Sequence, residues 1–233
     1  LANGFQNLFK TRYIVASYDM YLRNGHQSPA AGIHTDLPNF HHVYETENDL
    51  SLYIPLVDLD DENGGRLSVL PEGKLRVPGN VLLKLLYEHF SKEPSCLDAD
   101  GYVDPDRITR EQLAAFVKSK AHQDLMAVYK GATSLAKASY ADDFKKAVET
   151  KGTVLMFNNK NFHAAERWRN EHYDREIYVI RMVPIYDARI KLKSRLHGVP
   201  VNNLLIDLEK GTVHRSEQPV DLAQIPAAHK LKL

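Results

Sequence analysis

Apolar residues gather in short runs in the first and last parts of the chain, and turn-forming residues separate the runs. The runs are rich in Val, Ile, Tyr and Phe, which favour the pleated, half-buried surface of a sheet. We therefore predict β-strands over residues 11–23 (TRYIVASYDMYLR), 50–60 (LSLYIPLVDLD), 152–159 (GTVLMFNN) and 175–187 (REIYVIRMVPIYD). Because Pro55 has no N–H for a ladder hydrogen bond, we expect it at a sheet edge or a bulge.

Shorter strands are expected beside two turns. An Asn-Gly-Gly turn at residues 63–65 leads into a predicted short strand over residues 66–70. In the tail, the segment NNLLIDLEKGTVHR predicts two short strands around a Lys-Gly turn. Turn signals at intervals of about ten residues are typical of β-sandwiches and β-barrels.

The middle of the chain has a different pattern. Between about residues 81 and 150, apolar residues recur at helical spacing, and Ala, Leu, Lys and Glu predominate. Thr109 and Gln112 have the spacing of a capping box, in which each side chain accepts a hydrogen bond from the backbone N–H of the other residue. The pattern predicts helices over this stretch, one of which begins after Thr109.

The order of these patterns predicts how the chain is organised. We expect a β core over about 11–80 and 152–190, a helical insertion over about 81–150, and a C-terminal extension over about 191–233. An insertion that separates two blocks of strands favours one β core, and hence a single domain over 1–233, with the helices packed outside the core or over it as a lid. The predicted fold class is mainly β with a helical insertion.

Composition narrows the range of partners and compartments. The 233 residues include 30 basic and 30 acidic side chains, so no net field attracts nucleic acid or an anionic membrane. No basic stripe with interleaved aromatic residues and no apolar run of membrane-spanning length is present in the sequence. A single cysteine, Cys96, excludes an internal disulfide and favours a reducing cytoplasm. We expect a small-molecule substrate, and the sequence leaves the oligomeric state open.

The segment GIHTD introduces candidate metal chemistry. Alternate side chains of an extended segment share a face, so His34 and Asp36 can bind one cation. The pair alone is a weak signal, because His34 could simply form a hydrogen bond with a neighbouring carboxylate on a loop. A second histidine, His163, follows the predicted strand at 152–159. Two histidines and one carboxylate form the facial triad of non-heme Fe(II) oxygenases, which leaves metal positions open.

Two arginines on the last predicted strand are candidates for binding an anion. Arg175 opens this strand, and a guanidinium is a rigid two-pronged donor suited to a carboxylate. A surface salt bridge with Glu171 or Asp174 is the alternative explanation for Arg175. Arg181 has the same strand parity and is the second candidate.

Three segments together resemble a known family. GIHTD, LSLYIPLVDLDDENGGRLSVLPEGK and GTVLMFNNKNFHAAERWRNEHYDR are similar, in this order, to segments of Fe(II)/2-oxoglutarate-dependent dioxygenases of the phytanoyl-CoA dioxygenase (PhyH) type. The resemblance implies a double-stranded β-helix (a jelly-roll, cupin-like core) with flanking α-helices. It also implies that His34, Asp36 and His163 bind Fe(II), and that Arg175, or else Arg181, holds the far carboxylate of 2-oxoglutarate.

The resemblance also implies an activity. Members of this family hydroxylate unactivated C–H bonds while converting 2-oxoglutarate and O₂ to succinate and CO₂, and related enzymes desaturate, cyclise or epimerise their substrates. Related halogenases lack the carboxylate ligand, so the presence of Asp36 disfavours halogenation. Family members usually have more chain before the His-x-Asp motif, and we expect that an N-terminal part of the domain precedes the given sequence.

Two other functions are compatible with the same residues. A zinc-dependent hydrolase could use the His/Asp/His site to hold a metal-bound water, although the anion-binding arginine is then unexplained. A non-catalytic cupin-like protein could use the barrel to bind a ligand. Both remain open from the sequence.

Overall fold

The computed structural model describes twelve segments of the chain, with gaps between them. They are residues 6–8, 10–36, 50–75, 85–86, 88–97, 99, 103–104, 107–147, 150–185, 195–196, 199–200 and 204–215.

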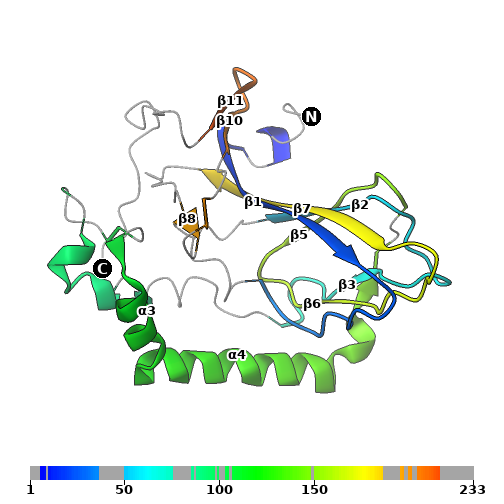
Figure 1. Ribbon diagram of the computed structural model, residues 1–233, viewed down its shortest axis with the longest axis horizontal. Coiled ribbons are helices and arrows are strands. Elements are labelled where there is room, and N and C mark those ends of the chain that lie inside the picture. The colour runs from blue at the N-terminus through cyan, green and yellow to red at the C-terminus, as the bar shows by residue number, and fades with distance from the viewer. Residues whose placement is uncertain are drawn as a thin grey trace.

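Most of the strands belong to two antiparallel sheets (Figure 1). The larger sheet has six strands in the order β11-β10-β1-β7-β2-β5: β11 (Thr212–Arg215), β10 (Leu204–Asp207), β1 (Tyr13–Asn24), β7 (Arg175–Ile185), β2 (Leu50–Pro55) and β5 (Leu155–Asn158). The smaller sheet has the order β4-β3-β6: β4 (Lys145–Lys146), β3 (Leu67–Val69) and β6 (His163–Ala165). A separate pair is formed by β8 (Arg195–Leu196) and β9 (Val199–Pro200).

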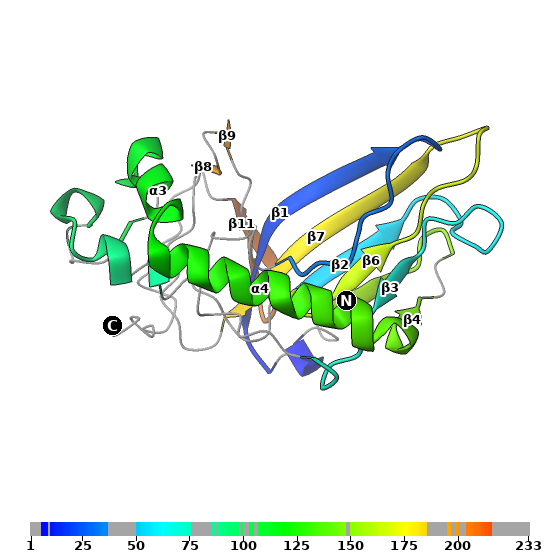
Figure 2. The ribbon, with the colours of Figure 1, turned by 90° about the horizontal axis from the view of Figure 1, so that it is seen from below.

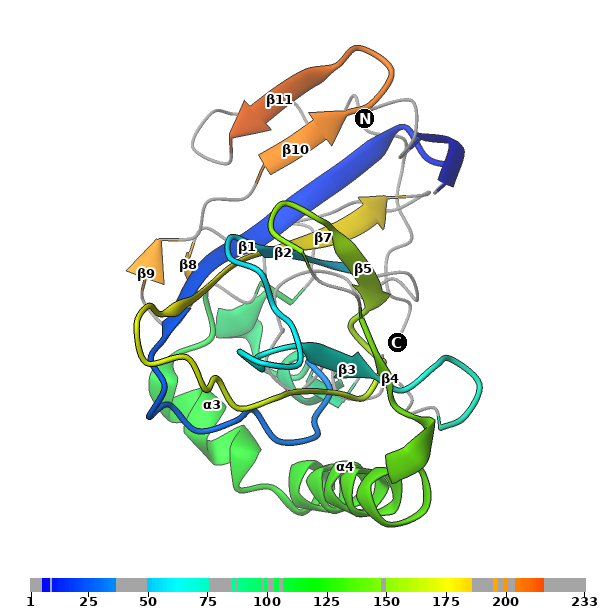
Figure 3. The ribbon, with the colours of Figure 1, turned by 90° about the vertical axis from the view of Figure 1, so that its right-hand side faces the viewer.

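The path of the chain between the two sheets identifies the fold. The chain runs from β1 in the larger sheet to a β-bridge at His34 beside β6, returns to β2, and enters the smaller sheet again at β3 and β4. It then passes to β5 in the larger sheet, β6 in the smaller sheet and β7 in the larger sheet (Figure 3). This alternation between two facing sheets is that of a double-stranded β-helix, so the predicted fold class is confirmed.

The hydrophobic core lies between the two sheets. On β7, residues 175, 177, 179 and 181 are buried and the residues between them are partly exposed, as the two-residue period of a strand requires. One cluster of buried residues combines side chains of both sheets: Tyr53, Leu59, Leu67, Phe157, Ala165, Trp168, Ile177 and Val179. This packing holds the two sheets face to face around an interior that also contains polar residues.

α4 (Lys120–Ser139) packs outside the smaller sheet, whereas Phe116 of α3 (Arg110–Val117) packs with Phe90, Cys96 and Val103 of the helical region. α3 begins with the predicted capping box of Thr109 and Gln112, which is confirmed, and α4 follows it. The buried Tyr129 and Ala136 of α4 form a cluster with Leu70 and Phe162, which adjoin β3 and β6. Figures 2 and 3 show α4 running along this side of the barrel. None of the helices in the described segments is both long and apolar enough to span a membrane.

Two sequence expectations need correction. The predicted helical stretch of about 81–150 contains β4, because Lys145 and Lys146 pair with β3 through backbone hydrogen bonds that side-chain periodicity does not reveal. Pro55 is not on an edge strand, since β2 lies between β5 and β7. It is the last residue of β2 and lies beyond the register with β5, so its missing N–H breaks no ladder on that side.

Candidate metal centre

Backbone pairing brings the two distant parts of the candidate site together. His34 and His163 exchange two backbone hydrogen bonds, with N···O distances of 3.0 and 2.9 Å, and the Asp36 N–H donates to the Asn159 carbonyl at 3.2 Å. The His-x-Asp segment therefore lies antiparallel to residues 159–163, at the edge of the smaller sheet. This register places all three predicted ligands at one end of the barrel.

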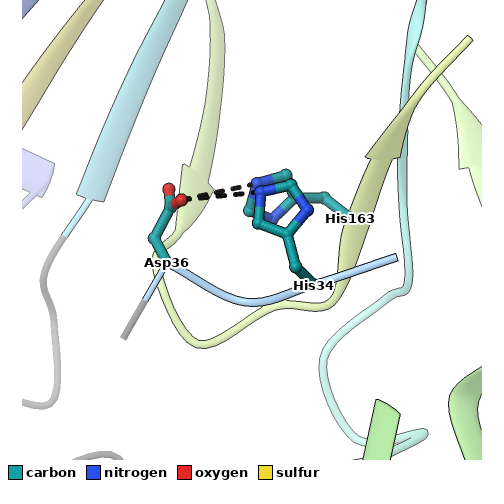
Figure 4. A group of neighbouring side chains, drawn as sticks. All are labelled: His34, Asp36 and His163. Carbon is teal, nitrogen blue, oxygen red and sulfur yellow. Dashed lines mark ion pairs between the residues drawn. The ribbon is translucent and has the colours of Figure 1, made fainter. Parts of the chain in front are cut away.

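The side chains of His34, Asp36 and His163 converge (Figure 4). One carboxylate oxygen, Asp36 Oδ1, lies 3.8 Å from His34 Nε2 and 3.7 Å from His163 Nε2. The three candidate donor atoms lie within 4.8 Å of one another. In the part of the chain that the structure describes, no other group of His, Cys, Asp or Glu side chains meets this distance.

The hydrogen bonds of the two histidines leave the same ring nitrogen available on each. His34 Nδ1 lies 2.7 Å from the Gly32 carbonyl, and His163 Nδ1 lies 3.0 Å from the Asn161 carbonyl. A carbonyl can only accept, so each Nδ1 carries the proton and donates it, and each Nε2 keeps its lone pair. Bonds of this kind orient metal-binding histidines and fix their tautomer.

Burial keeps His163 neutral. Desolvation lowers the pKa of His163 to about 4, and this effect exceeds the opposing attraction of Asp36. The ring packs against Phe157, with the ring centroids 4.9 Å apart. A neutral imidazole is the form that binds a metal ion. The side chain of His34 is 40% exposed and that of His163 only 5%, so the group is accessible to solvent from the His34 side.

The second oxygen of Asp36 faces an arginine. Arg181 Nη2 lies 2.7 Å from Asp36 Oδ2, and Arg181 Nη1 donates to the Ser51 hydroxyl at 2.6 Å. The Ser51 hydroxyl in turn donates to Asn159 Oδ1. The sequence did not assign Ser51 to the site, and it placed Arg181 at a co-substrate rather than at Asp36. Strand parity gave the inward direction of Arg181, but the pairing of Ser51 with Arg181 depends on the register between β2 and β7.

Arg175 lies apart from this group, at the start of β7. Its guanidinium donates to the Gly65 carbonyl at 2.9 Å, to Asn24 Oδ1 at 3.2 Å and to the Tyr53 hydroxyl. The alternative of a surface salt bridge with Asp174 is wrong, because Arg175 is buried and Asp174 pairs with Arg23 at 2.6 Å. Within the described segments Arg175 forms no ion pair, and the three acceptors named here are neutral.

Comparisons with known proteins give distant structural similarity only. No family model matches the chain, and no curated protein matches it. The structure is similar to the epimerase SnoN in complex with Fe3+, alpha ketoglutarate and nogalamycin RO, with a TM-score of 0.44 and 10% identity over 84% of this chain and 61% of that one. It is also similar to the non-heme alpha ketoglutarate dependent carbocyclase SnoK from nogalamycin biosynthesis, with a TM-score of 0.44 and 16% identity over 85% of this chain and 63% of that one.

A third similar structure is EctD from S. alaskensis with 2-oxoglutarate and 5-hydroxyectoine, with a TM-score of 0.40 and 15% identity over 79% of this chain and 49% of that one. The chain thus spans less than two thirds of the length of each of these three structures. Because their TM-scores lie below 0.5, the function proposed below rests on the residues of this chain.

Proposed function

We propose that the chain is an Fe(II)/2-oxoglutarate-dependent oxygenase whose metal ligands are His34, Asp36 and His163. The observation that carries this proposal is the convergence of two imidazole Nε2 atoms and one carboxylate oxygen within 4.8 Å of one another. Both imidazoles have the tautomer that a metal requires. Three protein ligands of this type leave metal positions open, as in non-heme Fe(II) oxygenases.

The partners of the two arginines support Arg175 as the anchor for 2-oxoglutarate. A guanidinium keeps its charge even when it is buried. Arg181 already faces the carboxylate of Asp36, whereas Arg175 meets neutral acceptors. A carboxylate that enters the barrel would therefore find at Arg175 a positive charge that no carboxylate of the described segments neutralises. We assign the far carboxylate of 2-oxoglutarate to Arg175, with the Tyr53 hydroxyl beside it.

The buried Arg175 favours an oxygenase over a zinc hydrolase or a non-catalytic ligand-binding protein. A zinc hydrolase needs a metal-bound water and no second anion site within the barrel. The buried Arg175 is explained when a dicarboxylate reaches from the metal toward the interior. A bound metal with 2-oxoglutarate would supply the activation of O₂, and succinate and CO₂ would be the co-products.

The protein's own residues would bind, orient and shield the reactants. Phe157 and Trp168 belong to the core that keeps water from the interior, while the exposed side of His34 offers the approach for a substrate. We propose that the substrate is a small molecule and that the reaction is hydroxylation of an unactivated C–H bond. The retained carboxylate of Asp36 disfavours halogenation.

Formation of succinate separates the three functions. The purified protein is incubated under air with Fe(II), 2-oxoglutarate and a set of candidate small molecules, and succinate is measured in parallel with the Zn(II)-loaded and metal-free protein. If the protein is an oxygenase, succinate should form with the Fe(II)-loaded protein and not with the Zn(II)-loaded or metal-free protein. Ester or amide hydrolysis by the Zn(II)-loaded protein without succinate would favour the hydrolase. Binding of 2-oxoglutarate without any turnover would favour a ligand-binding protein.

A further inference from the structure

Four buried polar side chains form a connected network behind the candidate metal ligands. Asp36, Arg181, Ser51 and Asn159 are 4%, 6%, 0% and 5% exposed, respectively. Arg181 bridges Asp36 and Ser51 with two nitrogens of one guanidinium, at 2.7 and 2.6 Å. Buried polar groups are held firmly when each of them has a partner. The carboxylate of Asp36 therefore sits in a preformed cradle made by β2, β7 and the segment after β5.

The two carboxylate oxygens of Asp36 have different neighbours in this cradle. Oδ2 faces Arg181 and lies 3.5 Å from the Ser51 hydroxyl, whereas Oδ1 lies 3.7 to 3.8 Å from the two imidazole Nε2 atoms. We propose that Arg181 is a positioning residue that holds Oδ2, so that Asp36 binds the metal through Oδ1 alone. This inference rests on the metal site of the proposed function and assigns Arg181 a role other than holding 2-oxoglutarate.

The consequence concerns the number of open metal positions. A carboxylate that binds through one oxygen occupies one position, and a carboxylate that binds through both occupies two. With Asp36 held to one oxygen, three positions stay open, which accommodates a chelating co-substrate and one further ligand. Without Arg181, Oδ2 would be free to turn toward the metal and take one of these positions.

Charge and geometry make a joint prediction for Arg181→Met. Removing a cation from beside the metal site lowers the repulsion of a divalent ion, and a second carboxylate oxygen adds a ligand. Co(II) affinity should therefore stay the same or increase. Binding of 2-oxoglutarate to the Co(II)-loaded protein should weaken by at least about tenfold, because the co-substrate then competes with the second carboxylate oxygen for a metal position. If Arg181 had only a structural role, its removal would damage the site and Co(II) affinity would decrease.

The test uses Co(II) as the probe and requires no turnover. Visible absorption and X-ray absorption of the Co(II)-loaded protein report the coordination before 2-oxoglutarate is added. In Arg181→Met, the second carboxylate oxygen of Asp36 is expected to replace one water ligand, which brings the carboxylate carbon closer to the Co(II) ion in the X-ray absorption data. Arg181→Lys keeps the cation without the two-pronged donor and is the second variant should Arg181→Met fold poorly. It is expected to give a mixture of the two coordination modes.

Arg175→Met is the matched control, because it removes another buried arginine from the inward face of the same strand. It should leave the Co(II) spectrum unchanged before 2-oxoglutarate is added, although it too weakens binding of 2-oxoglutarate. The inference about Arg181 is overturned when both Arg181 variants keep the wild-type coordination, or when they lose Co(II). Failure of the wild-type protein to bind Co(II) at all would instead overturn the proposed metal site itself.

Discussion

The inward face of β7 carries Arg175 at its start and Arg181 six residues further along, and the two arginines have different surroundings. Arg181 faces the carboxylate of Asp36 and the hydroxyl of Ser51, whereas Arg175 is surrounded by Tyr53, Asn24 and the Gly65 carbonyl. Six residues of strand separate their backbones by about 20 Å. On the same strand face, Arg181 thus pairs with a carboxylate, whereas Arg175 has no carboxylate partner among the residues that the structure describes.

This difference supports the separate tasks that we propose for the surroundings of Arg181 and of Arg175. A compensated guanidinium has little attraction left for a free anion and acts on the group with which it is paired. An uncompensated, buried guanidinium stays charged and favours an anionic ligand. We therefore place the metal at the Arg181 end and the far carboxylate of the co-substrate toward Arg175.

We expect the largest effect from removal of one of the proposed metal ligands. His163→Ala deletes a buried ligand whose Nε2 faces Asp36 Oδ1 at 3.7 Å. We expect complete loss of Fe(II)-dependent succinate formation and a loss of metal affinity, measured by enzyme assay and by Co(II) titration. His172→Ala, on an exposed loop, is the control and should behave as the wild type does. Turnover by His163→Ala with Fe(II) would show that the metal lies elsewhere.

The next effect separates the two arginines. Arg175→Ala removes the charged donor that we assign to the far carboxylate of 2-oxoglutarate. A hydrogen bond to a charged group contributes about 1.5–3 kcal/mol, so the 2-oxoglutarate concentration needed for half-maximal turnover should rise by about 10- to 100-fold. Co(II) affinity should remain nearly unchanged. An unchanged requirement for 2-oxoglutarate would move the anchor to Arg181 and remove the contrast between the two ends.

The sequence predicted the three metal ligands better than it predicted the roles of the two arginines. His34, Asp36 and His163 were predicted because ligand chemistry restricts residue type and because the motif resembles a family, and the structure brings the three side chains together. Arg175 and Arg181 could be ranked only by their positions on the predicted strand, because both have the same strand parity. Their partners depend on the register of β7 with β1 and β2, which is set by packing of the whole sheet.

The fold shows the same division between local and long-range information. Strong local signals were sufficient for β1, β2, β7 and the capping box of α3. β4 was missed because two lysines with exposed side chains have no strand pattern, and only their pairing with β3 makes them a strand. The serine of the metal cradle was missed for the same reason, since Ser51 has a role only where Arg181 lies opposite it.

The pH dependence of stability tests the burial of His163 in the metal-free protein. In the unfolded chain His163 has a pKa near 6.5, and burial lowers the folded value to about 4. Between these values the unfolded state binds a proton that the folded state does not, so stability falls as the pH drops through this range, by about 1.4 kcal/mol per pH unit. Denaturant unfolding of the chelator-treated protein measures this slope. His163→Gln cannot take up the proton and should lack this component, and equal slopes in the two proteins would contradict a buried, neutral His163.

The smallest effect concerns the glycine that supports Arg175. Gly65 has a φ of +75°, and a Cβ added there would lie 2.8 Å from the Trp168 ring and 2.9 Å from Arg175 Cδ. Gly73 also has a positive φ, of +94°, but a Cβ there meets nothing within 4 Å. Both Gly→Ala variants therefore introduce backbone strain, and only Gly65→Ala introduces a clash.

Denaturant unfolding of the two variants separates the effect of the clash at Gly65→Ala from the backbone strain that both variants share. We expect Gly65→Ala to lower the free energy of unfolding by about 1–3 kcal/mol more than Gly73→Ala does, because overpacking displaces side chains on both sides of the added methyl group. Gly65→Ala should also weaken 2-oxoglutarate binding by moving the Arg175 guanidinium away from the Gly65 carbonyl, and it should leave Co(II) affinity unchanged. A loss of Co(II) affinity in Gly65→Ala would mean that the two ends of the barrel are coupled, and the separate tasks assigned to Arg175 and Arg181 would no longer hold.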